Sequence, residues 1–205
     1  NLIVSYHPII FNGLKQITND NYVQKSVIKA VKNNISVYAI HTSLDNHPKG
    51  ISYLLSNLIG LKNISVLLPK EEKLNKIKRG MGSIGELEKP MYEITFFDLL
   101  KNKLGLKYIR HSNKLNKKIS KVSVVVGSGS FAIKDSIESN VDAFITSDFK
   151  YHNFFEADNK AILIDIGHYE SEKFTKELIY NYLLKKIPKF ACIIANTNTN
   201  PVNYY

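Results

Sequence analysis

Apolar positions in the first 69 residues recur at two spacings. Continuous or alternating apolar runs are typical of strands, whereas a spacing of three and four residues is typical of helices. Gly60 stands where a helix commonly ends. The predicted order is strand (2–5), helix (19–34), strand (36–40), helix (50–60) and strand (63–68). This alternation favours an α/β sheet with parallel members.

The second half of the chain continues in the same style. Its predicted elements are strand (121–127), helix (131–140), strand (142–147), strand (160–166), helix (171–186) and strand (189–196). The two halves share an architecture, but no clear residue-level repeat relates them. The pattern therefore predicts an α/β fold in both halves.

A charged and then glycine-rich stretch separates the halves. Such composition between periodic segments is typical of a connection. We therefore predict a first α/β half over 1–69, a linker over 70–90 and a second α/β half over 91–205. The chain opens at Asn1 within an apolar run, NLIVS, so we expect the N-terminal part of the first half to be missing.

The composition is typical of a folded, soluble protein, and we expect the cytoplasm as its location. At 205 residues and 44% hydrophobic content, the chain can bury an ordinary core. No apolar stretch has the length of a membrane span, and no N-terminal signal pattern is present. The lone cysteine, Cys192, lies in an apolar strand-like run, so we expect a buried and unreactive thiol.

The net charge of +10 would permit nucleic-acid binding. All the basic residues except Arg79 and Arg110 are lysines, and they are scattered through every segment. Base reading and bidentate phosphate contacts favour arginine instead. We interpret the charge as composition bias on a solvated surface, and we do not expect nucleic acid as a partner.

Polar side chains with metal-binding chemistry follow several predicted strands. Ligands of open α/β sheets bind beyond the C-terminal ends of the strands. Four of the six histidines fall at such positions. The residues concerned are Tyr6, His7, His41, Asp45, Asp148, His152, His168 and Glu172. Each alone is typical of a turn or a helix cap, whereas together they offer the nitrogen and oxygen donors of a divalent-cation site. The residues alone leave both interpretations open.

Two further motifs bear on the chemistry. His168 and Glu172 are four residues apart at the start of a predicted helix, so their side chains share one face. GSGS at 127–130 precedes a helix, where its backbone N–H groups would suit a phosphate. No GxSxG elbow is present and Cys192 has no obvious histidine partner, so nucleophilic catalysis is the weaker enzyme interpretation.

Six motifs occur in a known order: SYHPIIFNGLKQIT, YAIHTSLDNHPKG, GSIGELEKP, VVVGSGSF, DAFITSDFKYH and IDIGHYESE. In this order they resemble the Nif-three-like family, often labelled GTP cyclohydrolase 1 type 2 homologues, over nearly the whole chain. The resemblance implies two interlinked α/β lobes with mixed sheets flanked by helices. It also implies a dinuclear metal centre and a toroidal homohexamer with its sites facing an internal cavity.

The resemblance also implies residue roles. The metal ligands would be His7, Asp45, His168 and Glu172, with Glu172 bridging two divalent ions. His41 and His152 would line the same pocket, where they are candidates for proton transfer or for contacts to the ligands. Zinc, manganese, iron and nickel all suit this donor set.

The sequence departs from the family pattern at two places besides its N-terminus. Tyr6 stands where many members have a first histidine, and neutral tyrosine is a poor ligand, so one ion would be weakly held or missing. Many relatives also carry an inserted domain near KLNKIKRGMG, whereas the connection here is direct.

Two functions are therefore expected as alternatives. The first is a metal-dependent hydrolase that activates water against a nucleotide such as GTP or another phosphate-containing small molecule. The second is a metal-binding hexameric assembly or regulatory protein without turnover, which the tyrosine at position 6 would fit. A nucleic-acid binder would rest on charge alone. A membrane is not expected as a partner.

Overall fold

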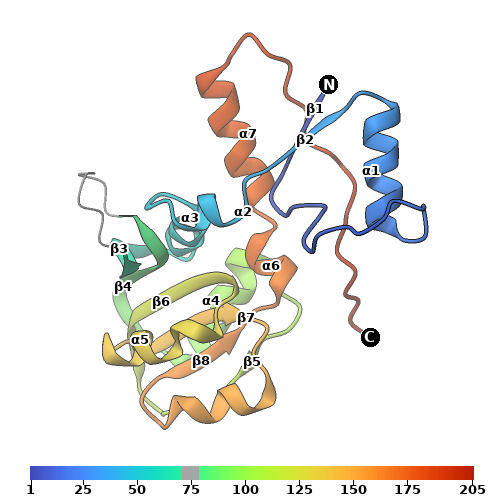
Figure 1. Cartoon of the computed structure of the whole chain (residues 1–205). Coiled ribbons are helices and arrows are strands. Elements are labelled where there is room, and N and C mark those ends of the chain that lie inside the picture. Colours follow the sequence, from blue (N-terminus) through green and yellow to red (C-terminus); the bar gives the residue numbers. More distant parts are fainter. Residues whose placement is uncertain (71–78) are drawn as a thin grey trace. The chain divides into compact units, whose positions relative to one another are not determined.

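The computed structural model describes residues 1–70 and 79–205, which form two compact units, unit 1 (Asn1–Leu44) and unit 2 (Asp45–Tyr205) (Figure 1). In unit 1, two strands pair in parallel with Leu2 opposite Ser36. The elements are β1 (Leu2–Ser5), α1 (Tyr22–Lys32), β2 (Ser36–Ala39) and α2 (His41–Asp45), whose last residue opens unit 2. The strands predicted over 2–5 and 36–40 and the helix between them are confirmed.

Unit 2 is built on one six-stranded sheet in the order β3-β4-β6-β7-β8-β5. Neighbours β6, β7 and β8 are parallel, and the remaining pairs are antiparallel. The strands are β3 (Leu61–Pro69), β4 (Gly80–Tyr92), β5 (Arg110–His111), β6 (Lys118–Ser128), β7 (Ala143–Ser147) and β8 (Ile162–Asp165). Because β6, β7 and β8 run the same way, the loops that follow them emerge at one edge of the sheet.

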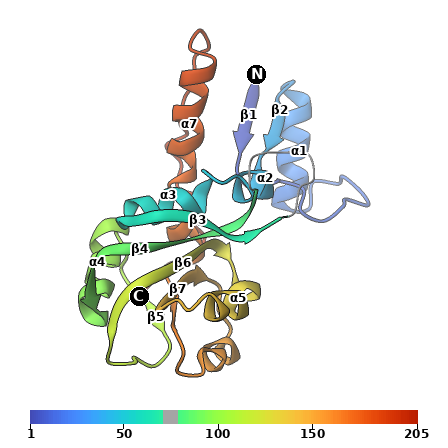
Figure 2. The ribbon, with the colours of Figure 1, turned by 90° about the vertical axis from the view of Figure 1, so that its left-hand side faces the viewer.

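Helices cover both faces of this sheet. The helices of unit 2 are α3 (Ile51–Leu58), α4 (Glu93–Leu104), η1 (Ser130–Ala132), α5 (Ile133–Glu138), η2 (Tyr151–Ala157), α6 (His168–Glu172) and α7 (Thr175–Lys186), where η marks a 3-10 helix. The last of them, α7, extends away from the sheet (Figure 1). In Figure 2, α4 and α5 lie on opposite sides of the strands. The predicted α/β class, with mixed sheets flanked by helices, is confirmed.

The strands β7 and β8 are fully buried along their length. Alternate side chains serve the two faces, as the pleat requires. Phe144 and Leu163 join one cluster with Ile133 of α5 and Phe149 beyond β7. This packing fixes the ends of the strands, from which the polar loops extend.

The prediction of a linker over 70–90 was wrong for the residues from 80 onward. Residues 80–92 form β4, which pairs with both β3 and β6, while residues 71–78 lie outside the described residues. The glycines there permit close strand approach: a Cβ on Gly85 would lie 2.8 Å from the Lys62 carbonyl oxygen. The strand β3, predicted beside the strands of the first half, belongs to the sheet of unit 2.

The strand predicted over 189–196 is also wrong. Residues 191–205 have no regular secondary structure, and Ile193 is 91% exposed. An apolar run becomes a strand only when a partner strand supplies the ladder hydrogen bonds, and none of the described strands pairs with this run. Cys192 is half-buried and free rather than buried. Among the described residues, no helix is both long and apolar enough to cross a membrane.

Candidate metal site

Unit 1 gathers three of the predicted polar residues behind its parallel strands. The hydrogen bond from the His41 backbone N–H to the Tyr6 carbonyl oxygen, 2.9 Å, joins the segment after β2 to the segment after β1. The rings of His7 and His41 are 5.2 Å apart between centroids, and the Tyr6 ring lies 4.9 Å from His7. Asp45 lies one helical turn after His41, at the end of α2. The ends of β1 and β2 thus bring these aromatic and imidazole side chains together, although the two strands form a sheet of their own, separate from the sheet that contains β6, β7 and β8.

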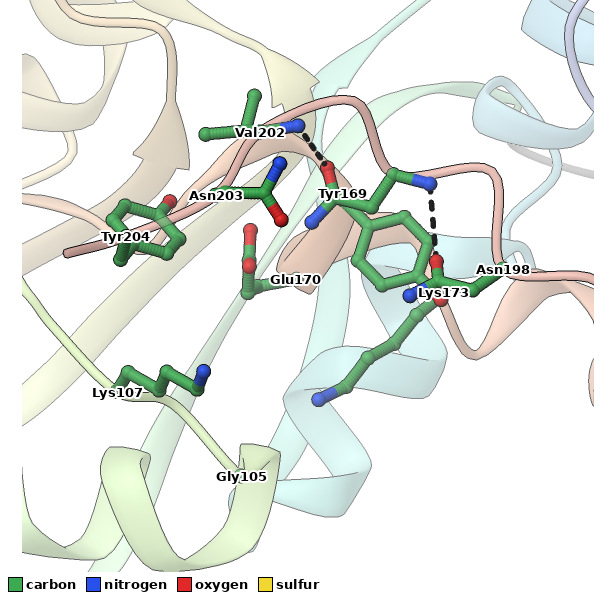
Figure 3. Close-up of a pocket in the computed structure, with 10 residues that line it drawn as sticks. Gly105, Lys107, Tyr169, Glu170, Lys173, Asn198, Val202, Asn203 and Tyr204 are labelled. Carbon is green, nitrogen blue, oxygen red and sulfur yellow. Dashed lines mark hydrogen bonds between the residues drawn. The ribbon is translucent and has the colours of Figure 1, made fainter.

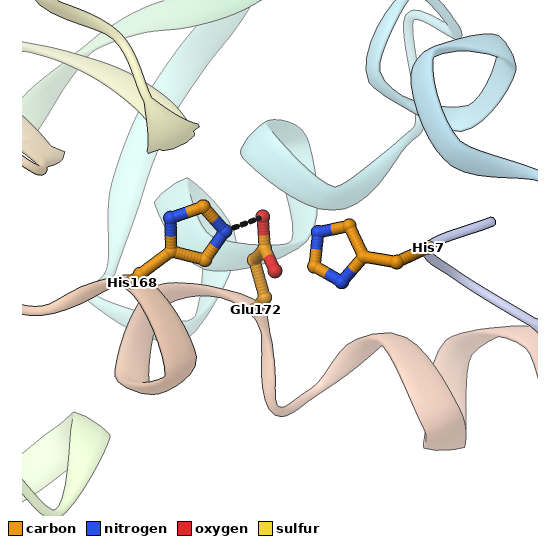
Figure 4. A group of neighbouring side chains, drawn as sticks. All are labelled: His7, His168 and Glu172. Carbon is orange, nitrogen blue, oxygen red and sulfur yellow. Dashed lines mark ion pairs between the residues drawn. The ribbon is translucent and has the colours of Figure 1, made fainter. Parts of the chain in front are cut away.

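Unit 2 places His168 and Glu172 on one face of the short helix α6. The Nε2 atom of His168 lies 3.0 Å from Oε1 of Glu172, and Figure 4 shows the ring turned toward that carboxylate. The glutamate side chain is 11% exposed and the histidine side chain 39%, so the pair is partly open to solvent. The predicted i, i+4 geometry is therefore present.

The other nitrogen of His168 faces a second carboxylate. Its Nδ1 lies 2.6 Å from Oδ2 of Asp148, which directly follows β7. The hydrogen bond to Glu172, opposed by burial and reinforced by Asp148, raises the pKa of His168 to about 9. In the absence of an ion, the imidazole is therefore protonated at neutral pH and donates from both ring nitrogens.

The carboxylate of Glu172 packs directly on the end of β6. A Cβ on Gly127 would lie 2.6 Å from Glu172 Oε1, and the backbone of Gly127 is left-handed, with φ of 70°. The buried hydroxyl of Ser171 accepts the Gly127 N–H at 3.0 Å and donates to the His168 carbonyl at 2.8 Å. These bonds tie α6 to β6 and hold the carboxylate in place.

His152 has a different setting from the other predicted residues. It is exposed on η2, where its ring lies 5.3 Å from Tyr151 and 6.3 Å from Phe155. The described contacts place it among aromatic neighbours of its own helix.

The sequence placed Asp148 among the possible oxygen donors and Gly127 in a possible phosphate-binding turn, but it predicted neither the Asp148–His168 hydrogen bond nor the packing of Glu172 on Gly127. Both contacts join residues far apart in the sequence, so local spacing does not predict them. The available signal was the parallel order of β6, β7 and β8, which brings the ends of these three strands to one edge.

A polar pocket of about 280 Å³ lies on the other side of α6 (Figure 3). Glu170 and Lys173 line it from α6, and Lys107 lines it from the loop before β5. The C-terminal segment also lines it, with two successive asparagine turns in which Asn198 and Asn200 accept backbone N–H groups at 3.0 and 3.1 Å. The helix therefore presents His168 and Glu172 on one face and the pocket residues on another.

A protein-family model described as Duf34/NIF3 (NGG1p interacting factor 3) matches residues 1–201. The chain belongs to the Duf34/NIF3 family. A Clostridium perfringens relative named GTP cyclohydrolase 1 type 2 homolog is 33% identical over 174 residues. A Campylobacter jejuni relative of the same name is 31% identical over 206 residues, which cover 100% of this chain and 76% of the relative. The resemblance deduced from the six motifs is therefore confirmed.

The Duf34/NIF3 fold is also seen among solved structures. The Staphylococcus aureus protein SA1388 matches 100% of this chain and 80% of its own, with a TM-score of 0.87 and 24% identity. The alignment with the Clostridium perfringens relative covers 83% of this chain but 64% of the relative. This chain therefore spans less than two thirds of that member of the family.

Proposed function

We propose that this Duf34/NIF3 chain binds divalent metal ions and uses them to hydrolyse a phosphate-containing small molecule. The main support is the His168–Glu172 pair on α6, whose possible metal-binding atoms, Nε2 of His168 and Oε1 of Glu172, lie 3.0 Å apart. Two donors that close serve one cation without a change of backbone, since one turn of helix sets their spacing.

The surrounding residues fit such an ion. Asp148 holds the Nδ1 of His168, which leaves Nε2 as the donor nitrogen and matches the carboxylate–histidine arrangement common at metal sites. Gly127 leaves space for the Glu172 carboxylate, which any side chain at that position would fill. Nitrogen and carboxylate donors suit zinc, manganese, iron and nickel alike.

The remaining ligands in the proposal come from the family resemblance. His7 and Asp45 would complete the set of metal ligands, and Glu172 would be shared by two ions, as carboxylates are in two-metal hydrolytic sites. The support in this chain is chemical: His7 and Asp45 are a nitrogen donor and an oxygen donor that follow β1 and β2.

Bound ions of this kind supply Lewis acidity, which lowers the pKa of water and polarises a phosphoryl or carbon centre. The chain's own contribution would be positioning and proton transfer. His41 is proposed to exchange a proton with substrate or solvent, and His152 is a further candidate for that role. A nucleotide such as GTP is the first substrate to test, because curated relatives bear the cyclohydrolase name.

Metal content per chain tests the binding step. Protein reconstituted with zinc or manganese is compared by elemental analysis with Glu172→Gln and with the matched control Glu170→Gln. The control removes a carboxylate of the same helix that lines the polar pocket instead. We expect about two ions in the parent and the control and a loss of both in Glu172→Gln. A parent protein that binds no ion would contradict the proposal.

A second candidate function is a metal-binding assembly without turnover. Tyr6 favours it, because its ring packs against His7 and His41 at the position where the family resemblance implies a histidine. The variant Tyr6→His separates the two functions: if it gains an ion and turns over GTP or a phosphodiester while the parent does not, the parent is a non-catalytic binder. Turnover by the parent itself would exclude this candidate.

We also propose a homohexamer as the state in which the chain works. Support comes from apolar side chains of β1 and β2 that are exposed in the single chain: Leu2 (63%), Ile3 (50%), Val37 (42%) and Tyr38 (59%). Apolar strand surface of this kind is commonly covered by a partner. Light scattering coupled to size exclusion would measure the mass, and a monomer at micromolar concentration would contradict the proposal.

A further inference from the structure

Asp165 ends β8 and is bonded to the two loops that carry Asp148 and His168. Its side chain is 5% exposed. Its Oδ2 accepts the backbone N–H of Phe149 at 3.1 Å, and its Oδ1 accepts the backbone N–H of Gly167 at 3.0 Å. Phe149 directly follows Asp148, and Gly167 directly precedes His168. One buried carboxylate thus holds both loops at the sheet edge.

Arg110 reinforces this arrangement from the neighbouring strand. The register of β5 and β8 places Arg110 opposite Asp165. Its Nη1 donates to Asp165 Oδ2 at 3.0 Å, and its Nη2 donates to the Phe149 carbonyl oxygen at 3.0 Å. The planar guanidinium therefore links the carboxylate to the loop after β7 through two directed bonds. We call these two side chains the Arg110–Asp165 clamp.

The loops held by the clamp have unusual backbones. Asp148 has φ of 60°, and Gly167 has φ of 88°. A left-handed aspartate is costly and persists when surrounding bonds fix it. The bonds that fix these two loops include those of the clamp, at the residues next to the Asp148–His168 pair.

We propose that the Arg110–Asp165 clamp positions Asp148 against His168, which makes Asp165 a positioning residue of the candidate metal site. The expected effect of the clamp on metal affinity rests on the proposed function. The expected effect of the clamp on the His168–Asp148 hydrogen bond does not, because that bond is present without an ion. The two claims therefore separate in one set of variants.

The test compares Asp165→Asn with the matched control Asp142→Asn in metal-free protein. Asp142 also accepts two backbone N–H groups, from Ser120 and Lys121 at 2.9 Å each, and pairs with Lys117. It precedes β7, whereas Asp148 follows that strand. The imidazole resonances of His168, assigned by their loss in His168→Gln, report the Nδ1 hydrogen bond.

We expect Asp165→Asn to lose the downfield Nδ1–H resonance of His168, and Asp142→Asn to keep it even where both lower the melting temperature. After reconstitution, Asp165→Asn should bind zinc about tenfold more weakly, a loss typical of residues that orient a ligand. Arg110→Met leaves both backbone N–H groups bonded to Asp165, so it should shift the Nδ1–H resonance of His168 in the same direction but by less. If Asp165→Asn does not fold, Arg110→Met serves as the test of the clamp.

Unchanged His168 resonances in Asp165→Asn, or in Arg110→Met where the first variant does not fold, would overturn the inference. An equal change in Asp142→Asn would also overturn it, since general destabilisation would then explain the effect. A parent protein that binds none of zinc, manganese, iron and nickel would refute the proposed function and leave the resonance test of the clamp valid.

Discussion

At the scale of residues, the candidate site depends on the close contact between the Glu172 carboxylate and Gly127. Glu172 reaches the end of β6 because Gly127 has no side chain there, and Ser171 locks the same glycine through its N–H. The carbonyl of Gly127 accepts the hydroxyls of Thr146 and Ser147 at 3.0 and 2.6 Å. The backbone N–H and the backbone carbonyl of Gly127 are therefore both satisfied by neighbours of the site.

Gly127→Ala should disturb this approach directly. The new Cβ would meet Glu172 Oε1, and a left-handed φ of 70° is strained for alanine. We expect a loss of about 1–3 kcal/mol in the free energy of unfolding and a fall of about tenfold or more in zinc affinity, measured by urea denaturation and calorimetric titration.

Gly60→Ala is the control for that substitution. Gly60 has φ of 89°, but a Cβ there would meet no atom within 4 Å. It should show the backbone cost without a change in zinc affinity. Equal zinc affinities for both variants and the parent would contradict the role assigned to Gly127.

Asp142 provides a test by pH away from the site. Burial raises its pKa, but the backbone N–H groups of Lys121 and Ser120 and the Lys117 ammonium outweigh burial and hold the pKa below 3.8. A lowered folded-state pKa stabilises the protein above the unfolded value and loses that effect as pH falls through the folded value.

Asp142→Asn should therefore be less stable than the parent at pH 7, by about 1.5–3 kcal/mol if its charge-assisted bonds are lost. The difference should shrink below pH 3.8 as the parent carboxylate takes up its proton. Urea titrations at pH 7 and at pH 3 would measure it. A difference that stays constant between the two pH values would count against the carboxylate as its source.

At the scale of elements, α1 depends on the residues before it. The Asn21 side chain accepts the Gln24 N–H at 3.0 Å, in the manner of an N-cap. The Gln24 side chain reaches back and accepts the backbone N–H groups of Thr18 and Asp20 at 3.0 and 2.9 Å. Gln24 is thus a buried polar residue that organises the loop ahead of the helix.

Gln24→Ala would leave two backbone donors without this acceptor. We expect a loss of about 1–3 kcal/mol for the unit that contains α1 and faster amide exchange over residues 18–26. Lys25→Ala, an exposed change on the same helix, should have almost no effect. Amide exchange measured by nuclear magnetic resonance would separate the two, and equal rates in both variants would contradict the assignment.

The spacing of apolar residues predicted those strands and helices that have a continuous apolar run or one apolar face. The strands at 143–147 and 162–165 and the helix at 51–58 were found because their apolar runs are continuous or one-sided. The strand at 80–92 was missed because its glycines resemble a loop, although they serve strand approach. The run at 189–196 misled in the opposite direction, since pairing depends on a distant partner.

At the scale of the whole molecule, the same distinction explains what could be foreseen of the site. The spacing of His168 and Glu172 is a property of one helical turn, so the sequence contained it. The contact of His168 with Asp148 joins residues 20 apart, and the Asp165 bond to Arg110 joins residues 55 apart. Such pairs follow from strand order and register, which periodicity does not specify.

Burial is also unevenly distributed over the chain. Gln24 is the one buried residue of unit 1, all of whose residues are described, whereas the buried apolar side chains lie in unit 2. A parallel pair of short strands without a core is marginal by itself. The sheet of unit 2 carries the bulk of the hydrophobic stabilisation, since Phe144, Ile145 and Leu163 are fully buried in it.

Hydrogen exchange of the whole chain should therefore fall into two classes. Amides of β6, β7 and β8 should exchange slowly through global unfolding, while those of β1 and β2 should open locally and exchange at least tenfold faster in dilute protein. Mass spectrometry across a dilution series measures both at once.

If apolar β1 and β2 are covered by further copies of the chain, their protection should rise with concentration while that of β6 to β8 stays constant. Equal protection of both groups at the lowest concentration would show that unit 1 is stable by itself, and the proposed assembly would lose its energetic support.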